Sequence, residues 1–114
     1  MKKQLVITLF LALSLLSACS EMNPHPMDMS QALQSATSKA DHEALAKHYD
    51  EAAEAMQVKV DEHKKLLDQY QSKSYLYGRQ AEDLKAHSQE LINVYEKAVA
   101  ANRKMAEMHR KIAR

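Results

Sequence analysis

The sequence contains one glycine, two prolines and no tryptophan among its 114 residues. Sheets and turn-rich folds use glycine and proline at their corners, so this scarcity argues against a β fold. Alanine, leucine, lysine, glutamate and glutamine are plentiful, and these residues favour helices. The composition therefore predicts an all-α protein of a single domain, small enough to gain stability from self-association.

Cysteine is equally scarce, since Cys19 is the only one. The chain therefore cannot form an intrachain disulfide, a cysteine-ligated zinc or iron–sulfur site, or a covalent haem attachment. Neither positive nor negative charge is in clear excess, because the formal net charge is +1. A nucleic-acid partner normally requires a strong basic excess, and none is expected here.

The first 18 residues have the pattern of a signal peptide. Lys2 and Lys3 form a positive start, and an apolar run over 5–16 follows that is too short to span a bilayer comfortably. The run ends in Leu16-Ser17-Ala18-Cys19, which resembles the lipobox of bacterial lipoproteins. The resemblance implies cleavage between Ala18 and Cys19 and lipid on Cys19. An ordinary secretory leader with an incidental cysteine is the alternative.

This resemblance also implies a location. Two or three acyl chains anchor a protein stably in a membrane, where one chain binds only marginally. Ser20, and not Asp, follows the cysteine, which in enteric-type sorting resembles an outer-membrane destination. We therefore expect a lipid-anchored protein of the cell envelope that sits on the outer membrane and faces the periplasm.

Residues 19–37 are predicted to form a flexible tether, because they show no helical or alternating period and Pro24 and Pro26 favour extended backbone. Within them, thioether and imidazole groups cluster at Met22, His25, Met27 and Met29. Soft sulfur with imidazole suits Cu(I), and the cluster resembles the Met/His-rich segments of periplasmic copper-handling proteins. A linker that carries methionines by chance is the alternative interpretation.

Residues 38–114 carry helical periodicity. One apolar seam is expected through His42, Leu45, Tyr49, Ala52 and Met56, continuing after an irregular step at Val60 through His63, Leu67 and Tyr70. Two adjoining seams follow later in the chain. The first has Leu84, His87, Leu91, Val94, Ala98, Ala101, Met105, Met108 and Ile112; the second has Ile92, Tyr95, Val99, Ala106, His109 and Ala113.

A turn near 73–79, around Gly78, would join the two periodic segments into a helical hairpin of two long antiparallel helices. A reversal near Tyr75 would place Leu67 opposite Leu84 and Met56 opposite Val94. Such a thin hairpin predicts a homodimer that forms a four-helix bundle. One continuous helix is the competing architecture, and it would resemble rod lipoproteins such as the murein lipoprotein, because a mid-helix glycine costs only about 1 kcal/mol.

Histidines fall at facing positions of this hairpin. His42 would lie opposite His109 and His63 opposite His87, and paired imidazoles on facing helices are how metal sites are built in bundles. Asp41, Met105 or Met108 could complete the first site and Glu62 the second. The alternatives are histidines that fix the register and a turn shifted toward Gly78, which would break both pairs.

The chain shows no nucleophile with its base and no glycine-rich phosphate loop, so we expect no enzymatic activity and no required cofactor. The sequence instead predicts a structural or protein-interaction lipoprotein, with handling of copper or another transition metal as the alternative. The strings HEALAKHY over 42–49 and KSYLYGRQ over 73–80 resemble those of a type of small, uncharacterised proteobacterial helical protein. This resemblance implies a helical hairpin and brings no activity with it.

Overall fold

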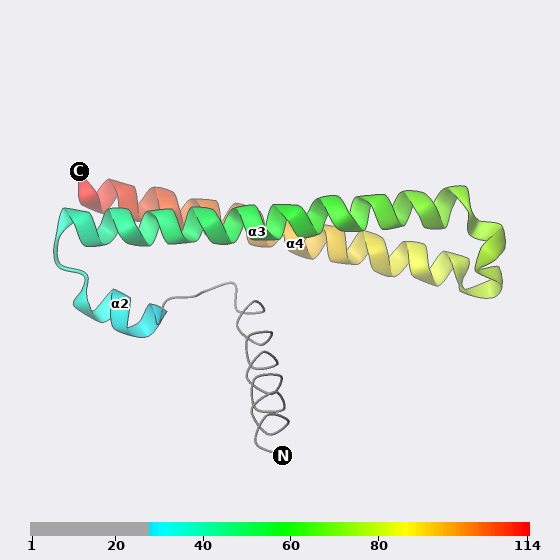
Figure 1. Ribbon diagram of the computed structural model, residues 1–114, viewed down its shortest axis with the longest axis horizontal. Coiled ribbons are helices and arrows are strands. Elements are labelled where there is room, and N and C mark those ends of the chain that lie inside the picture. Colours follow the sequence, from blue (N-terminus) through cyan, green and yellow to red (C-terminus); the bar gives the residue numbers. More distant parts are fainter. Residues whose placement is uncertain (1–27) are drawn as a thin grey trace, which may run out of the picture.

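The computed structural model describes residues 28–114, and every regular element in this range is helical. A short helix, α2 (Met29–Ser35), precedes two long ones, α3 (Lys39–Ser72) and α4 (Ala81–Ala113). Figure 1 shows α3 and α4 lying side by side along their lengths, with the chain end beside the start of α3. The predicted all-α helical hairpin is therefore confirmed, and the continuous helix is wrong. The predicted signal peptide and Cys19 lie outside the described residues.

Part of the predicted tether is helical, so the expectation of extended chain up to residue 37 is wrong over α2. The cause is local, because the Asp28 carboxylate accepts a hydrogen bond from the Gln31 backbone N–H and so caps the helix. The helix ends at Ser35, and its residues pack only lightly against α3. Asp28 and Met29, which close the methionine-rich segment, are thus fixed at a helix start.

The first long helix begins at a capping box. The Ser38 hydroxyl accepts a hydrogen bond from the Asp41 backbone N–H, and the Asp41 carboxylate accepts from the Ser38 and Thr37 backbone N–H groups. These backbone bonds lower the pKa of Asp41, because they stabilise its charged form. The start of α3 is therefore specified by its own sequence.

The reversal lies where the sequence predicts it. After Ser72 the chain makes two short 3₁₀ turns, over 74–76 and 78–80, and Gly78 takes a positive φ of 54° that disfavours other residues. The Tyr77 ring packs edge-on against Tyr70, and Gln69 donates a hydrogen bond to its hydroxyl. Tyr70 and Tyr77 therefore pack within the turn, whereas Tyr75 is 78% exposed.

The packed face of α3 is wider than the predicted seam by two residues. Ala46 and Ala53 are fully enclosed, and Ala53 belongs to the core cluster with Val60, Ile92 and Val99. With Ala46 and Ala53 in place of Leu45 and Ala52, successive seam residues from His42 to Tyr70 are alternately four and three positions apart. This seam therefore has no irregular step. Leu45 and Ala52 are also buried, at the edge of this interhelix seam.

On α4 the second predicted seam is mostly buried against α3, and the first is exposed or half-buried. Ile92, Val99, Ala106 and His109 are buried. By contrast, Leu91 is 40% exposed, Val94 54%, and Ile112 61%. The predicted contacts of Leu67 with Leu84 and of Met56 with Val94 are wrong, because His63 packs against Tyr95 and Lys64 pairs with Glu96. These contacts centre the reversal close to Gly78, as in the alternative turn, and not near Tyr75.

The physical reason lies in how closely the two backbones approach. Ala46 and Ala106 are 0% exposed and Ala53 is 1% exposed, so small side chains lie at the contact. Rings fill the wider positions: His63 stacks on Tyr95 with centroids 5.5 Å apart, and His109 stacks on Tyr49 at 5.6 Å. Small and planar groups alternate along this seam and interlock, whereas the bulkier seam of α4 has no such complement on α3.

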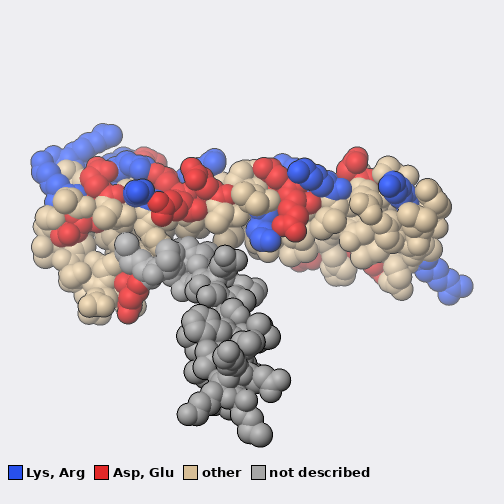
Figure 2. All heavy atoms as spheres, viewed as in Figure 1, with Lys and Arg blue, Asp and Glu red and all other residues tan. Residues whose placement is uncertain are grey.

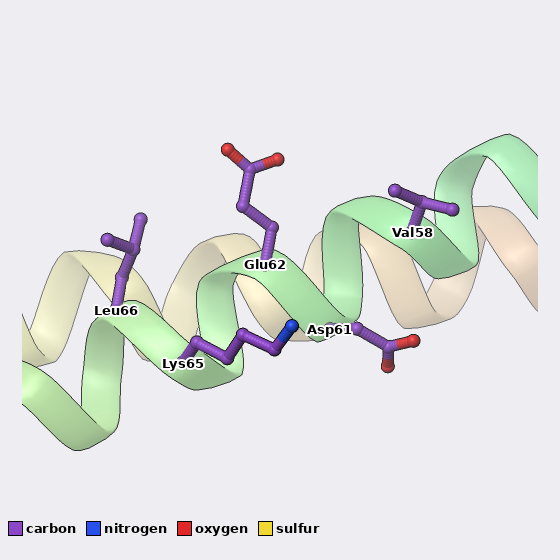
Figure 3. Close-up of a pocket in the computed structure, with 5 residues that line it drawn as sticks. All are labelled: Val58, Asp61, Glu62, Lys65 and Leu66. Atoms are coloured by element: carbon purple, nitrogen blue, oxygen red, sulfur yellow. The ribbon is translucent and has the colours of Figure 1, made fainter.

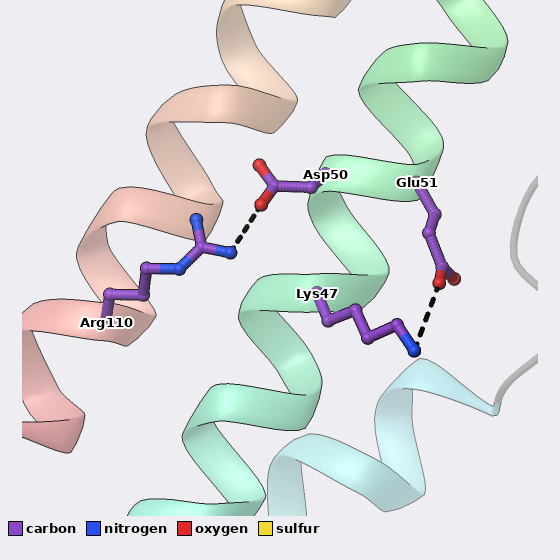
Figure 4. A network of polar contacts seen from close by, with 4 residues as sticks. All are labelled: Lys47, Asp50, Glu51 and Arg110. Carbon is purple, nitrogen blue, oxygen red and sulfur yellow. Dashed lines mark hydrogen bonds and ion pairs between the residues drawn. The ribbon is translucent and has the colours of Figure 1, made fainter.

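Ion pairs link α3 and α4 along one polar side of the hairpin. Arg110 forms an ion pair with Asp50, shown in Figure 4 beside the i,i+4 pair of Lys47 and Glu51 on α3. Lys64 pairs with Glu96 at 2.9 Å. Figure 2 shows acidic and basic side chains interspersed along the upper edge of the helix pair. These partly exposed pairs set the register more than they stabilise the fold, since exposed pairs contribute about 1 kcal/mol or less.

Among residues 28–114, no helix is both long enough and apolar enough to cross a membrane.

Candidate functional site

Three rings meet at the open end of the hairpin. The Nδ1 atoms of His42 and His109 lie 3.1 Å apart, and the two rings are stacked with centroids separated by 5.4 Å. Tyr49 covers the opposite face of His109. The predicted juxtaposition of His42 and His109 is therefore confirmed, while Tyr49 was not predicted as their partner. The sequence carries a signal for this contact, because Tyr49 follows His42 in a row of residues that recurs every seven positions, at 42, 49, 56, 63, 70 and 77. Residues seven positions apart lie on the same face of a helix.

The short Nδ1–Nδ1 distance fixes the protonation of the pair. One imidazole must donate and the other accept, so at most one of the two facing nitrogens carries a proton in the neutral pair. Burial lowers the pKa of His109, and the nearby His42 lowers it further. At the same end Asp50 is paired with Arg110, and Asp41 is engaged in its capping box. Protonating both imidazoles would therefore force two donors together.

The free energy of unfolding should consequently depend on pH. A histidine whose pKa is lower in the folded chain stabilises the fold above its unfolded pKa of about 6.5, and this contribution is lost as pH falls. We expect the melting temperature, followed by far-ultraviolet circular dichroism, to fall from neutral pH toward pH of about 5. In the His109→Gln variant the fall should be smaller. An equally steep fall in His109→Gln would contradict this account.

The ligands expected beside His42 and His109 do not assemble into a complete metal site. The Asp41 carboxylate is engaged in the capping box, Met105 is half-buried and Met108 is exposed. Within residues 28–114 no three histidine, cysteine, aspartate or glutamate residues come close enough to hold a metal ion. The described part of the site thus offers a pair of imidazole nitrogens.

The second predicted pair, His63 with His87, is not formed. His63 stacks on Tyr95, and its Nδ1 is buried without a hydrogen-bond partner among the described residues. His87 is exposed and lies 3.8 Å from Glu90. Glu62 pairs with Lys59, which lowers the pKa of Glu62 and raises that of Lys59. The reason is the register, because a reversal close to Gly78 places Tyr95, and not His87, opposite His63, as the alternative position of the turn predicts.

Met29 is half-buried at the start of α2. Met22, His25 and Met27 lie outside the described residues, so the expected copper-binding cluster stays a prediction.

The first predicted seam of α4 stays exposed or half-buried beside the seam that packs against α3. We call it the α4 stripe. It consists of Leu84, His87, Leu91, Val94, Ala98, Ala101, Met105, Met108 and Ile112. Four of its members are among the large hydrophobic residues that stay exposed: Leu91, Val94, Met108 and Ile112. An apolar seam of this length on a hydrated surface indicates an interaction site.

A charged row follows one edge of the stripe. Its residues are all exposed and again spaced by sevens: Asp83, Glu90, Lys97, Lys104 and Lys111. The first two are acidic and the last three are basic, which complements the dipole of α4. Glu107 lies one turn away between Lys104 and Lys111, and hydrogen bonds from Lys111 and then Lys104 lower its pKa to about 2. Glu107 therefore stays ionised and holds both ammonium groups at the end of α4.

A shallow hollow on α3 is the other surface feature. Figure 3 shows its lining, Val58, Asp61, Glu62, Lys65 and Leu66, all projecting from the outer surface of one helix. Val58 is 64% exposed, so the hollow is open to solvent. Because one helix supplies these five residues, they cannot surround a small molecule as the walls of a binding cleft would.

No protein-family model, curated protein or solved structure matches the chain.

Proposed function

We propose that this chain is a lipid-anchored protein of the bacterial cell envelope with a structural or protein-interaction role. The observation that carries the proposal is the α4 stripe, because its large apolar residues stay exposed after the hairpin has formed. An exposed apolar surface of this kind carries a free-energy cost in water, and binding of a partner removes that cost. The anchor is proposed from the sequence Leu16-Ser17-Ala18-Cys19.

The lipid anchor has a direct test. In cells fed an alkyne-bearing fatty acid, the native chain should take up the label and sediment with membranes. Cys19→Ser should lose the label completely, because the thiol is the group that receives the diacylglyceryl lipid, whose acyl chains carry the label. Ser20→Ala, at the neighbouring position, should keep it and serves as the control. A native chain that takes up no label would overturn the proposed anchor.

The envelope location can be tested by one further substitution. In enteric-type hosts, Ser20→Asp should move the labelled protein from the outer-membrane to the inner-membrane fraction, whereas Ser20→Ala should not. Equal amounts in both fractions for the native chain would contradict an outer-membrane destination.

A second function, transition-metal handling, is favoured by one observation, the Nδ1–Nδ1 distance of 3.1 Å between His42 and His109. Two nitrogens at this separation can share one metal ion with tetrahedral geometry, since zinc–nitrogen bonds are about 2.0–2.1 Å long. The remaining ligands would come from Met22, His25 and Met27 or from solvent. Copper or another transition metal would then be the bound ion.

The two functions make opposite demands on the same chain. Replacing Met22, His25, Met27 and Met29 should leave a structural protein active and abolish Cu(I) binding measured against a competing chelator. Polar substitutions at Leu91 or Val94 should destroy the interaction and leave metal binding unchanged. Binding no tighter than micromolar in the native chain would remove the metal function.

A further inference from the structure

We propose that the α4 stripe binds the α4 stripe of a second copy of this chain, with the two helices antiparallel. This inference names the partner of the interaction surface and to that extent rests on the proposed function. It does not depend on the lipid, because the contact involves residues of α4 alone. The chemistry of the partner follows from the spacing of the stripe and from the charges beside it.

The stripe has the spacing of a coiled-coil seam. Leu84, Leu91, Ala98, Met105 and Ile112 recur every seven residues, and His87, Val94, Ala101 and Met108 form the second heptad row. The stripe therefore spans four heptads, a length at which apolar rows with flanking charges indicate a coiled coil. Alanines at its centre permit close approach of a second helix. A stable dimer needs an interface of about 800 Å² on each partner, and a helix contact along most of the 33 residues of α4 is long enough to supply it.

The charged row selects the antiparallel orientation. Antiparallel pairing places the acidic first half of α4 beside the basic second half of the other copy. Asp83 then faces the partner's Lys111, and Glu90 faces the partner's Lys104. Parallel pairing would place like halves together, and it would set the row against positions such as Ser88 and Tyr95, which are buried or half-buried in the interhelix seam.

The same pairing uses the stripe from Leu84 to Met108. With these charge pairs formed, Leu84 meets the partner's Met108, Leu91 the partner's Ala101, and Val94 the partner's Ala98. His87 meets the partner's Met105, and Ile112 lies beyond the last apolar layer. Sliding the helices by one heptad in one direction would set Lys97 against the partner's Lys104. Sliding them in the other direction would leave Met105, Met108 and Ile112 without partners. Apolar overlap therefore favours this register, in which two acidic–basic pairs flank each side of a single Lys97–Lys97 contact at the two-fold axis.

This arrangement determines where the two anchors would be. The start of α3 and the end of α4 lie at the same end of each hairpin (Figure 1), and Lys39 donates a hydrogen bond to the carbonyl of Arg114 there. An antiparallel dimer carries these ends to opposite ends of the assembly, about 50 Å apart for helices of this length. Lipid on both copies would then hold the bundle at its two ends.

Single-cysteine crosslinking tests the orientation. The full chain with Cys19→Ser has no other thiol, so each added cysteine is the only reactive site, whether or not the native cysteine is lipidated. In detergent, with less than one chain per micelle, Lys97→Cys should crosslink through a short bismaleimide because it lies beside the two-fold axis. Ala100→Cys, exposed away from the stripe, and Tyr75→Cys, at the tip of the hairpin, should not. Crosslinking at Tyr75 but not at Lys97 would overturn the antiparallel proposal in favour of a parallel one.

A charge exchange tests the register in the same background. Glu90→Lys should weaken dimerisation about tenfold, because attraction at two symmetric sites becomes repulsion. Adding Lys104→Glu should restore it. Loss without restoration would show that these residues do not face each other. A chain that remains monomeric throughout would refute self-association while leaving the fatty-acid labelling, and hence the anchor, unaffected.

Discussion

Replacing Ile92 by Ala is expected to lower the free energy of unfolding by about 2–5 kcal/mol, because a buried branched side chain is lost and a cavity remains. Ile92 is 2% exposed and belongs to the core cluster with Val60 and Val99. Its neighbour Leu91 is 40% exposed. For a single chain, Leu91→Ala should therefore change stability by no more than about 0.5 kcal/mol.

The two variants form a matched pair at adjacent positions, and urea unfolding followed by far-ultraviolet circular dichroism measures both. Dilution separates folding from association, since a dimer through the α4 stripe makes the stability of the native chain depend on concentration. At high concentration Leu91→Ala should lose this dependence, whereas Ile92→Ala should be weaker at every concentration. A larger loss for Leu91→Ala at high dilution would mean that the first predicted seam packs in the hairpin after all.

The hairpin itself could be predicted from the sequence because its signals are local. Gly78 is the only glycine in the chain, and the structure gives it a positive φ within the turn. Ser38 and Asp41 form a capping box that begins α3. Only α2 was missed, because the cap at Asp28 directly follows a segment whose prolines favour extended backbone.

The rotation of α4 could not be predicted in the same way. Two apolar rows adjoin on this helix, and periodicity alone gives both the heptad spacing of a packed seam. The choice depends on how Ala53 and Val99, far apart in the sequence, fit together across the interface. Larger apolar residues on the α4 stripe suggested a core, yet close packing with α3 favours the smaller ones.

The same difference in packing explains why one predicted histidine pair forms and the other does not. His109 lies between His42 and Tyr49, one heptad apart on α3, and contacts both rings. Its pairing with His42 therefore survives a shift in register of half a heptad. His87 has no such tolerance, because a reversal close to Gly78 places Tyr95, and not His87, opposite His63.

The close approach of the helices leads to the second large effect. Ala106→Leu should destabilise the hairpin by about 1–3 kcal/mol, since three added carbons must enter a contact that has no room for them. Ala106 is 0% exposed, as is Ala46 on α3. Ala100→Leu adds the same atoms at an exposed position of α4 and should change stability by less than about 0.5 kcal/mol.

Thermal unfolding of these two variants therefore tests whether small residues decide which seam packs. If Ala106→Leu were as stable as Ala100→Leu, the helices would have to tolerate a wider separation at this contact. The bulkier α4 stripe could then pack against α3 equally well, and its exposure would no longer indicate a binding surface. A clear loss of stability for Ala106→Leu alone would instead leave the α4 stripe as the face available to a second copy.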